Sequence, residues 1–283
     1  MSTRRGIITG LIMLVAVASA LPPNAFLTQW KAANSAAAPA NPMTAYSDSS
    51  NIIGFWHSKN SGGLGIQLNN TSVASNVWVD ISGAGRDIAL SSFGWTSASG
   101  WADDGALVFN GSAGNASGTI AGLASNFTFM AIFKPAASTL GVVLEMSTNH
   151  GFNLGAWVCA INEVNANSVE SALKNSTSYF YTMSRSAAGV ITNGVYFIQQ
   201  AAFQTQDADS VFMTHYKDDT EIALDVDVRT PVALYNGAFY VGSRASSTLR
   251  INGSLKMLAI WKTTLTPAQI AHNAEIARSQ FGL

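Results

Sequence analysis

Three acidic residues at strand spacing, Glu221, Asp225 and Asp227, are the nearest approach in the chain to a hydrolase motif. Side chains at every second position of a β-strand point to one face, and hydrolysis of a glycosidic bond needs two carboxylates about 5 to 10 Å apart. The residues between them are apolar, however, and any half-buried strand shows this alternation. We therefore favour a solvated strand face with the apolar residues buried, and glycoside hydrolysis is a minor alternative.

Oxygen ligands for calcium are available in two turn-like segments. Asp80, Ser82 and Asp87 lie in a glycine-rich stretch, and Asp218 and Asp219 lie between two apolar runs. Carboxylate and hydroxyl oxygens are calcium ligands, but Asp and Ser also satisfy backbone groups in turns. The turn interpretation is favoured, and calcium is the one cofactor left open. None of the four histidines has the ligand spacing of a zinc site.

Aromatic side chains beside amides are candidates for stacking on sugar rings. The candidates are Trp56, Trp95, Trp101, Tyr179, Tyr181 and Tyr235. Most tryptophans of a β-sandwich belong to its core, so each of these rings is more often packed than exposed.

The single cysteine, Cys159, lies in the apolar run 156–161. This setting is typical of a small buried hydrophobic residue rather than of a nucleophile. One cysteine also excludes an internal disulfide and a multi-cysteine metal site, so stability must come from packing.

The composition describes a chain that can bury a large core. Of its 283 residues 48% are apolar and only 11% are charged, and the net charge is −1. A chain with so little charge has no basic surface for a phosphate backbone, which argues against nucleic acid as a partner.

The elements that position these residues are mostly strands. From residue 51 onwards, short apolar–polar alternations are separated by Gly, Asn, Asp and Ser, as in an antiparallel sandwich. Strands are predicted over 127–133, which is apolar on both faces, over 237–242 and over 254–262, with Asn252-Gly253 as a hairpin turn. A second hairpin joins 211–216 to 221–227.

One helix is predicted at the end of the chain. Thr266, Pro267 and Gln269 form a capping box with proline at the first helical position. A stripe of apolar residues follows, and Gly282 ends the helix. The stripe consists of Ile270, Ala274, Ala277 and Phe281.

The first fifty residues differ from the rest. Residues 1–20 have a basic start, an apolar run and a small-residue cleavage site, as in a signal peptide, and residues 21–50 form an Ala/Pro-rich linker or arm. The apolar run is too short for a stable transmembrane span. If this segment is retained, it is an assembly anchor. The anchor residues would be Ile7, Ile8, Leu11, Ile12, Leu14, Phe26 and Trp30.

Three segments resemble the concanavalin A-like lectin/glucanase superfamily, in particular its laminin-G-like branch. They are WVDISGAGRD at 78–87, GALVFNG at 105–111, and the closing strand and helix over 253–270. The resemblance implies one jelly-roll domain over 51–283, with carbohydrate or protein ligands on the concave face or rim loops. Several such domains bind calcium. The E-x-D-x-x-E motif of the laminarinase type is absent.

Residues 4–11 also resemble the N-termini of accessory structural proteins of tailed bacteriophages. Our preferred hypothesis is therefore a non-enzymatic structural and adhesion protein displayed on a virion surface. Its partners would be other virion proteins or further copies of itself, together with a host cell-surface glycan. The alternative is a secreted bacterial glycan-binding protein from which residues 1–20 are removed.

Overall fold

The structure, a computed structural model, describes residues 40–63, 65–71, 76–123, 125–149, 153–162, 165–174, 181–205, 211–227, 233–245 and 248–283. The chain divides into two units, Met1–Ala40 and Asn41–Leu283. All seven expected anchor residues lie outside the described residues. Within the described part, no helix is long and apolar enough to cross a membrane.

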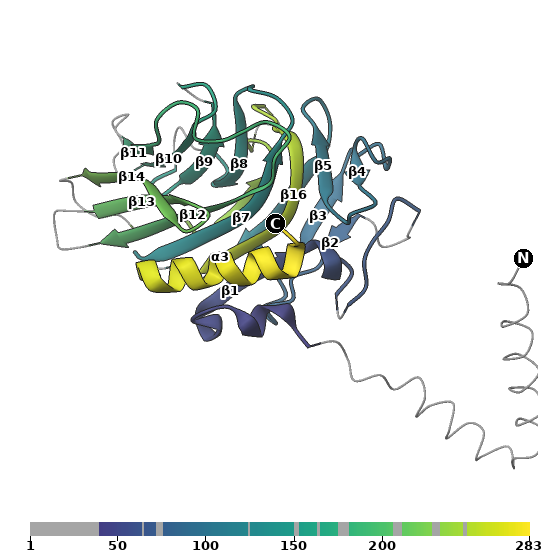
Figure 1. Ribbon diagram of the computed structural model, residues 1–283, viewed down its shortest axis with the longest axis horizontal. Coiled ribbons are helices and arrows are strands. Elements are labelled where there is room, and N and C mark those ends of the chain that lie inside the picture. The colour runs from purple at the N-terminus through teal and green to yellow at the C-terminus, as the bar shows by residue number, and fades with distance from the viewer. Residues whose placement is uncertain are drawn as a thin grey trace, which may run out of the picture. The chain divides into compact units, whose positions relative to one another are not determined.

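The second unit is a sandwich of two antiparallel sheets, which confirms the predicted all-β fold (Figure 1). In spatial order, sheet A consists of β14 (Thr220–Asp227), β13 (Val211–Lys217), β12 (Phe197–Thr205), β7 (Phe127–Pro135), β16 (Asn252–Trp261), β5 (Leu107–Asn110) and β4 (Gly100–Trp101), and β1 (Ile52–His57) also pairs with β16. Sheet B consists of β11 (Tyr181–Arg185), β10 (Val169–Lys174), β9 (Trp157–Ile161), β8 (Gly141–Met146), β15 (Gly237–Val241), β6 (Asn115–Ile120), β3 (Ile88–Ser91) and β2 (Val77–Trp78).

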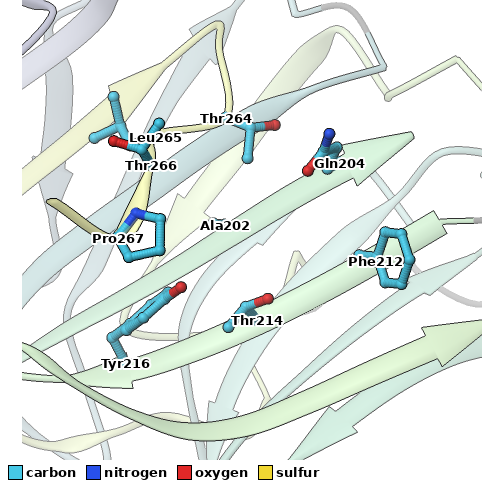
Figure 2. A pocket seen from close by; sticks show the side chains of 9 residues that line it. All are labelled: Ala202, Gln204, Phe212, Thr214, Tyr216, Thr264, Leu265, Thr266 and Pro267. Atoms are coloured by element: carbon cyan, nitrogen blue, oxygen red, sulfur yellow. The ribbon is translucent and has the colours of Figure 1, made fainter. Parts of the chain in front are cut away.

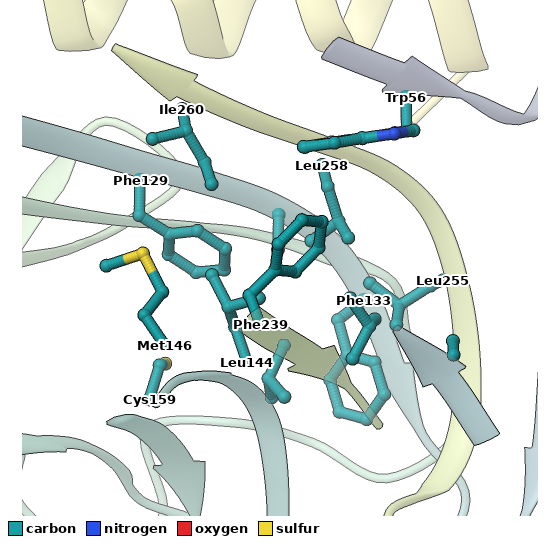
Figure 3. Close-up of a cluster of buried hydrophobic side chains, with 14 of the residues drawn as sticks. Trp56, Phe129, Phe133, Leu144, Met146, Cys159, Phe239, Leu255, Leu258 and Ile260 are labelled. Carbon is teal, nitrogen blue, oxygen red and sulfur yellow. The ribbon is translucent and has the colours of Figure 1, made fainter. Parts of the chain in front are cut away.

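The main core lies between the sheets. Strand β7 is buried on both faces, as its sequence predicts: Phe129 and Phe133 point into the sandwich, and Met130 and Ile132 point outwards. Figure 3 shows the inner rings among side chains of β16 and of sheet B. A central strand covered on both sides in this way fixes the position of its neighbours, β12 and β16.

Helix α3 (Pro267–Phe281) covers the outer face of sheet A (Figure 1). The predicted capping box is present at Thr266 and Gln269, and Gly282 ends the helix in the left-handed conformation with φ 68°. The predicted apolar stripe is buried against β1, β7, β12 and β16. Local sequence signals therefore set both ends of this helix.

The folded unit begins about ten residues before the expected boundary at 51. Two short 3-10 helices, η1 (Pro42–Ala45) and η2 (Ser49–Asn51), precede β1, and a third, η3 (Ser58–Asn60), follows it. Tyr46 is buried against Phe55, and Trp261 Nε1 donates to the carbonyl oxygen of Ser47 at 3.0 Å. These contacts make 41–50 part of the domain rather than of a linker.

The expected hairpin turn at Asn252-Gly253 is wrong, because both residues belong to β16 and pair with β5. The glycine is required for a different reason. A Cβ at Gly253 would lie 2.5 Å from the carbonyl oxygen of Lys134, so the neighbouring strand leaves room only for hydrogen. The other predicted hairpin, β13–β14, is confirmed, with Asp218 in the left-handed region at φ 59°.

Candidate functional site

A groove of about 350 Å³ lies on the outer face of sheet A, beside the start of α3 (Figure 2). It has two sides. One side is β13, and the other is the turn that leads from β16 into α3, with β12 between them. The lining residues are Ala202, Gln204, Phe212, Thr214, Tyr216, Thr264, Leu265, Thr266 and Pro267.

Strand alternation explains which side chains of β13 reach the groove. Phe212, Thr214 and Tyr216 point to the outer face, while Met213 and His215 are buried on the inner face. Ala202 of β12 pairs with Thr214 across the sheet and forms part of the groove floor. Because its side chain is small, it leaves space in the middle of the groove. At the two ends of the floor lie the aromatic side chains.

The opposite side of the groove is held by hydrogen bonds to the sheet. The Thr264 hydroxyl donates to the carbonyl oxygen of Phe203 at 2.6 Å, and the Leu265 backbone N–H donates to Thr128 Oγ1 at 2.9 Å. Thr266 caps α3 through Gln269. Because these contacts fix the turn in the free protein, a ligand would not have to order it on binding.

A second set of hydrogen bonds stabilises the end of the groove at which Tyr216 lies. Gln200 Nε2 donates to the carbonyl oxygens of Asp218, in the β13–β14 turn, and of Ile270, in α3, at 3.0 and 3.1 Å. Burial raises the pKa of Tyr216, and the nearby charge of Glu221 acts in the same direction. The Tyr216 side chain is therefore a neutral phenol that can donate or accept a hydrogen bond.

The lining of the groove contains aromatic, hydroxyl and amide groups, and none of its nine side chains is charged. Thr264 has donated its hydrogen and offers lone pairs, whereas the exposed amide of Gln204 can donate and accept. Such a surface can stack on the apolar face of a ring and bond its hydroxyl groups. It has no acid and base pair for hydrolysis.

The aromatic residues proposed from the sequence lie elsewhere. Trp56 and Trp101 are core residues, 0% and 2% exposed, so neither ring is available for stacking, and Trp56 Nε1 donates to a backbone carbonyl at 3.0 Å. Trp95 packs against Phe93 at a ring distance of 5.5 Å. Tyr235 is half-buried, donates its backbone N–H to the carbonyl oxygen of Gly155 at 2.9 Å, and does not line the groove.

Tyr179 and the side chain of Tyr181 lie outside the described part of the chain. The groove residues Phe212, Thr214 and Tyr216 were not proposed from the sequence, although their alternation within the predicted hairpin was visible. Only the location of the 264–267 turn opposite them makes this face a groove.

The glycine-rich stretch with Asp80 is a turn in which hydrogen-bond donors of the protein surround the Asp80 carboxylate. Asp80 Oδ1 accepts from the backbone N–H groups of Phe55 and Ser82, and Oδ2 accepts from the Ser82 hydroxyl and from Arg86 N, all within 3.0 Å. Asp87 in turn accepts from the Asp80 N–H at 2.8 Å. Since both oxygens of Asp80 face hydrogen-bond donors, these residues do not fit a calcium site.

The second expected calcium segment is also engaged within the protein. Asp218 Oδ1 accepts from the Ile198 N–H at 3.1 Å, and Asp219 forms an ion pair with Arg278 of α3 at 3.2 Å. In the described ranges, no group of three His, Cys, Asp or Glu side chains is placed to hold a metal ion. The two segments serve as turns that hold strands and helix together.

A β-bulge interrupts the row of carboxylates expected in β14. Glu221 pairs with Tyr216 and Ala223 with His215, so Ile222 is an extra residue in this strand. The bulge shifts the alternation by one position, because two residues of β14 face one of β13.

The consequence of the bulge is visible just beyond it. Leu224, which was expected on the buried face, is 54% exposed. Glu221 is also exposed, and the side chains of Asp225 and Asp227 lie outside the described part. Cys159 is buried as expected, and burial raises the pKa of its thiol to about 12, which leaves it protonated and unreactive.

The fold resembles several solved structures at low sequence identity. The receptor-binding domain of botulinum neurotoxin C/D mosaic serotype aligns with a TM-score of 0.54 and 10% identity, over 80% of this chain and 51% of that chain. Trypanosoma rangeli sialidase in complex with the inhibitor DANA aligns with a TM-score of 0.52 and 13% identity, over 82% and 34%. This chain thus spans about half of the toxin domain and a third of the sialidase.

At the level of sequence, no family model and no curated protein matches the chain. The likeness therefore concerns the arrangement of the two sheets rather than particular side chains. Together with the topology, it shows that the chain shares the two-sheet antiparallel β-sandwich fold of these structures.

Proposed function

We propose that this protein is a glycan-binding module that holds its ligand in the groove on sheet A and does not hydrolyse it. The observation that carries the proposal is the lining, in which the half-buried ring of Phe212 lies beside hydroxyl and amide groups without a charged residue. Sugars present apolar ring faces and hydroxyl groups, and this lining offers a partner for each. The lectin-like fold supports the same function.

We place the module in a secreted protein, with residues 1–20 as a removed signal peptide. Two features support this setting: the leader-like sequence of residues 1–20 and a groove that can bind a ligand without a neighbouring chain. The virion setting needs residues 1–50 to bind a neighbouring chain, and the folded unit already uses 41–50 for its own packing. Intact mass of the native protein separates the two: a chain starting near residue 21 supports secretion, and a chain starting at Met1 supports a retained anchor.

Phe212→Ala is expected to weaken glycan binding about tenfold, because it removes the half-buried ring that is available for stacking while leaving the strand paired. The measurement is a glycan array followed by titration calorimetry on the best ligand. Ile66→Ala is the matched control, since Ile66 is 60% exposed and does not line the groove. Equal binding by Phe212→Ala and the wild type would rule out the groove.

A further inference from the structure

The residues that line the groove are spread along strand β13. Phe212 and Tyr216 are four residues apart on one strand, which separates their Cα atoms by roughly 13 Å. Figure 2 shows these side chains at opposite ends, with Thr214 between them and the 264–267 turn and Gln204 along the other side. The groove therefore runs along β13 rather than closing around one point.

Hydrogen-bonding groups are distributed along this length. Thr214 and Tyr216 lie on the β13 side, and Thr264 and Gln204 lie across from them (Figure 2). A single pyranose ring is shorter than half of the roughly 13 Å between the Cα atoms of Phe212 and Tyr216, so it cannot reach from the Phe212 ring to the Tyr216 hydroxyl group. A trisaccharide laid along the groove can contact both, as well as the polar groups between them.

The charge of the surroundings selects the class of sugar. No lining residue is charged, and Glu221, which pairs with Tyr216 across the β13–β14 hairpin, places a carboxylate beside the tyrosine. An anionic sugar would meet this carboxylate and would find no lysine or arginine in the lining to replace its lost hydration. A neutral sugar carries no such penalty.

We infer that the groove binds an unbranched neutral oligosaccharide lengthwise along β13, and that it discriminates against single sugars and acidic sugars. The inference rests on the proposed function and specifies its ligand. Leu224, which pairs with Thr214 and is 54% exposed, adds an exposed apolar side chain next to the groove floor, on the side of the edge strand. The chain of sugars would thus lie between this floor and the fixed 264–267 turn.

The test is calorimetric titration of the full chain with cello-, malto- and xylo-oligosaccharides from one to six units, with sialyllactose as the acidic probe. In the series that binds, affinity is expected to rise at least tenfold between the monosaccharide and the trisaccharide and then to level off. Sialyllactose is expected to bind at least tenfold more weakly than the trisaccharide.

Variants connect the length dependence to the two ends of the groove. Phe212→Ala is expected to lower trisaccharide affinity about tenfold, and Tyr216→Phe, which keeps the buried ring, about threefold. Gln204→Ala changes an exposed side chain and tests the opposite side without disturbing the core. Ile66→Ala should bind every oligosaccharide as the wild type does.

The possible results distinguish an error in the proposed ligand class from an error in the proposed glycan-binding function. Equal affinity for the monosaccharide and the trisaccharide, or tighter binding of sialyllactose, would overturn the inference while leaving a glycan-binding protein. Length-dependent binding that is unaffected by Phe212→Ala, Tyr216→Phe and Gln204→Ala would move the ligand to another surface. Failure of every glycan on the array and in the titrations would overturn the proposed function itself.

Discussion

Replacing Asp80 with alanine is expected to lower the free energy of unfolding by about 3 to 5 kcal/mol. The carboxylate is 7% exposed and accepts four hydrogen bonds, three of them from backbone N–H groups of Phe55, Ser82 and Arg86. Alanine would leave these buried donors without a partner and would release the turn from β1. The measurement is urea unfolding of the folded domain at neutral pH.

Asp87→Ala is the matched control for this experiment. Asp87 is exposed and accepts a single backbone hydrogen bond, from Asp80 N, so its loss is expected to cost about 1 kcal/mol. Millimolar calcium is expected to leave the unfolding midpoint of the wild type unchanged. A clear rise in that midpoint with calcium, or a similar cost for both variants, would contradict the role of Asp80 as the hydrogen-bonded centre of the turn.

Elements whose signals lie within a few residues of each other were predictable from the sequence. The capping box at Thr266 and the terminal Gly282 define α3, and the continuous apolar character of 127–133 identifies a strand covered on both faces. The resemblance to the jelly-roll family added the arrangement of strands in two sheets. Periodicity alone would have left the order of the strands open.

The candidate site was not predictable in the same way, because its parts are distant in the sequence. The β13 residues are exposed to a groove only because the 264–267 turn lies opposite them, about fifty residues further along the chain. The rings of Trp56 and Trp101 were proposed for stacking because sequence gives the residue type and not its burial.

Single-residue irregularities account for the remaining errors. The extra residue Ile222 shifts the alternation of β14, so Leu224 faces solvent although the pattern placed it inside. Asn252-Gly253 has the composition of a turn, but Gly253 is needed because Lys134 lies too close for a side chain. In both cases the deciding contact is made with another strand, and the local sequence does not contain it.

Stability is expected to fall by several kcal/mol as the pH is lowered from 6.5 to 4, because two histidines are buried in the neutral form. Burial lowers the pKa of His215 to about 4, against a weaker opposing effect of Glu170. Burial also lowers the pKa of His57 to about 4, with Lys59 adding to this effect and a hydrogen bond to Gln280 opposing it. In the unfolded chain both groups have a pKa near 6.5.

Stability decreases in this pH range because the unfolded chain binds more protons than the folded protein. Between pH 6.5 and pH 4 the unfolded chain binds protons that the folded protein excludes, so stability decreases as the pH falls through this window. A difference of about 2.5 pKa units corresponds to about 3 kcal/mol for each histidine. Below pH 4 the folded protein also takes up these protons, and their contribution levels off.

The variant His215→Leu tests whether the buried histidines cause this loss of stability at low pH. His215 is fully buried on the inner face of β13, and no described residue gives either ring nitrogen a hydrogen-bond partner. Leucine has a similar volume and no polar group to desolvate, so stability at pH 8 is expected to be equal to or above that of the wild type. Urea unfolding from pH 8 to pH 4 should show about half of the wild-type decrease, and the double variant His57→Gln/His215→Leu should show little of it. An unchanged decrease in His215→Leu would mean that other groups cause the acid sensitivity.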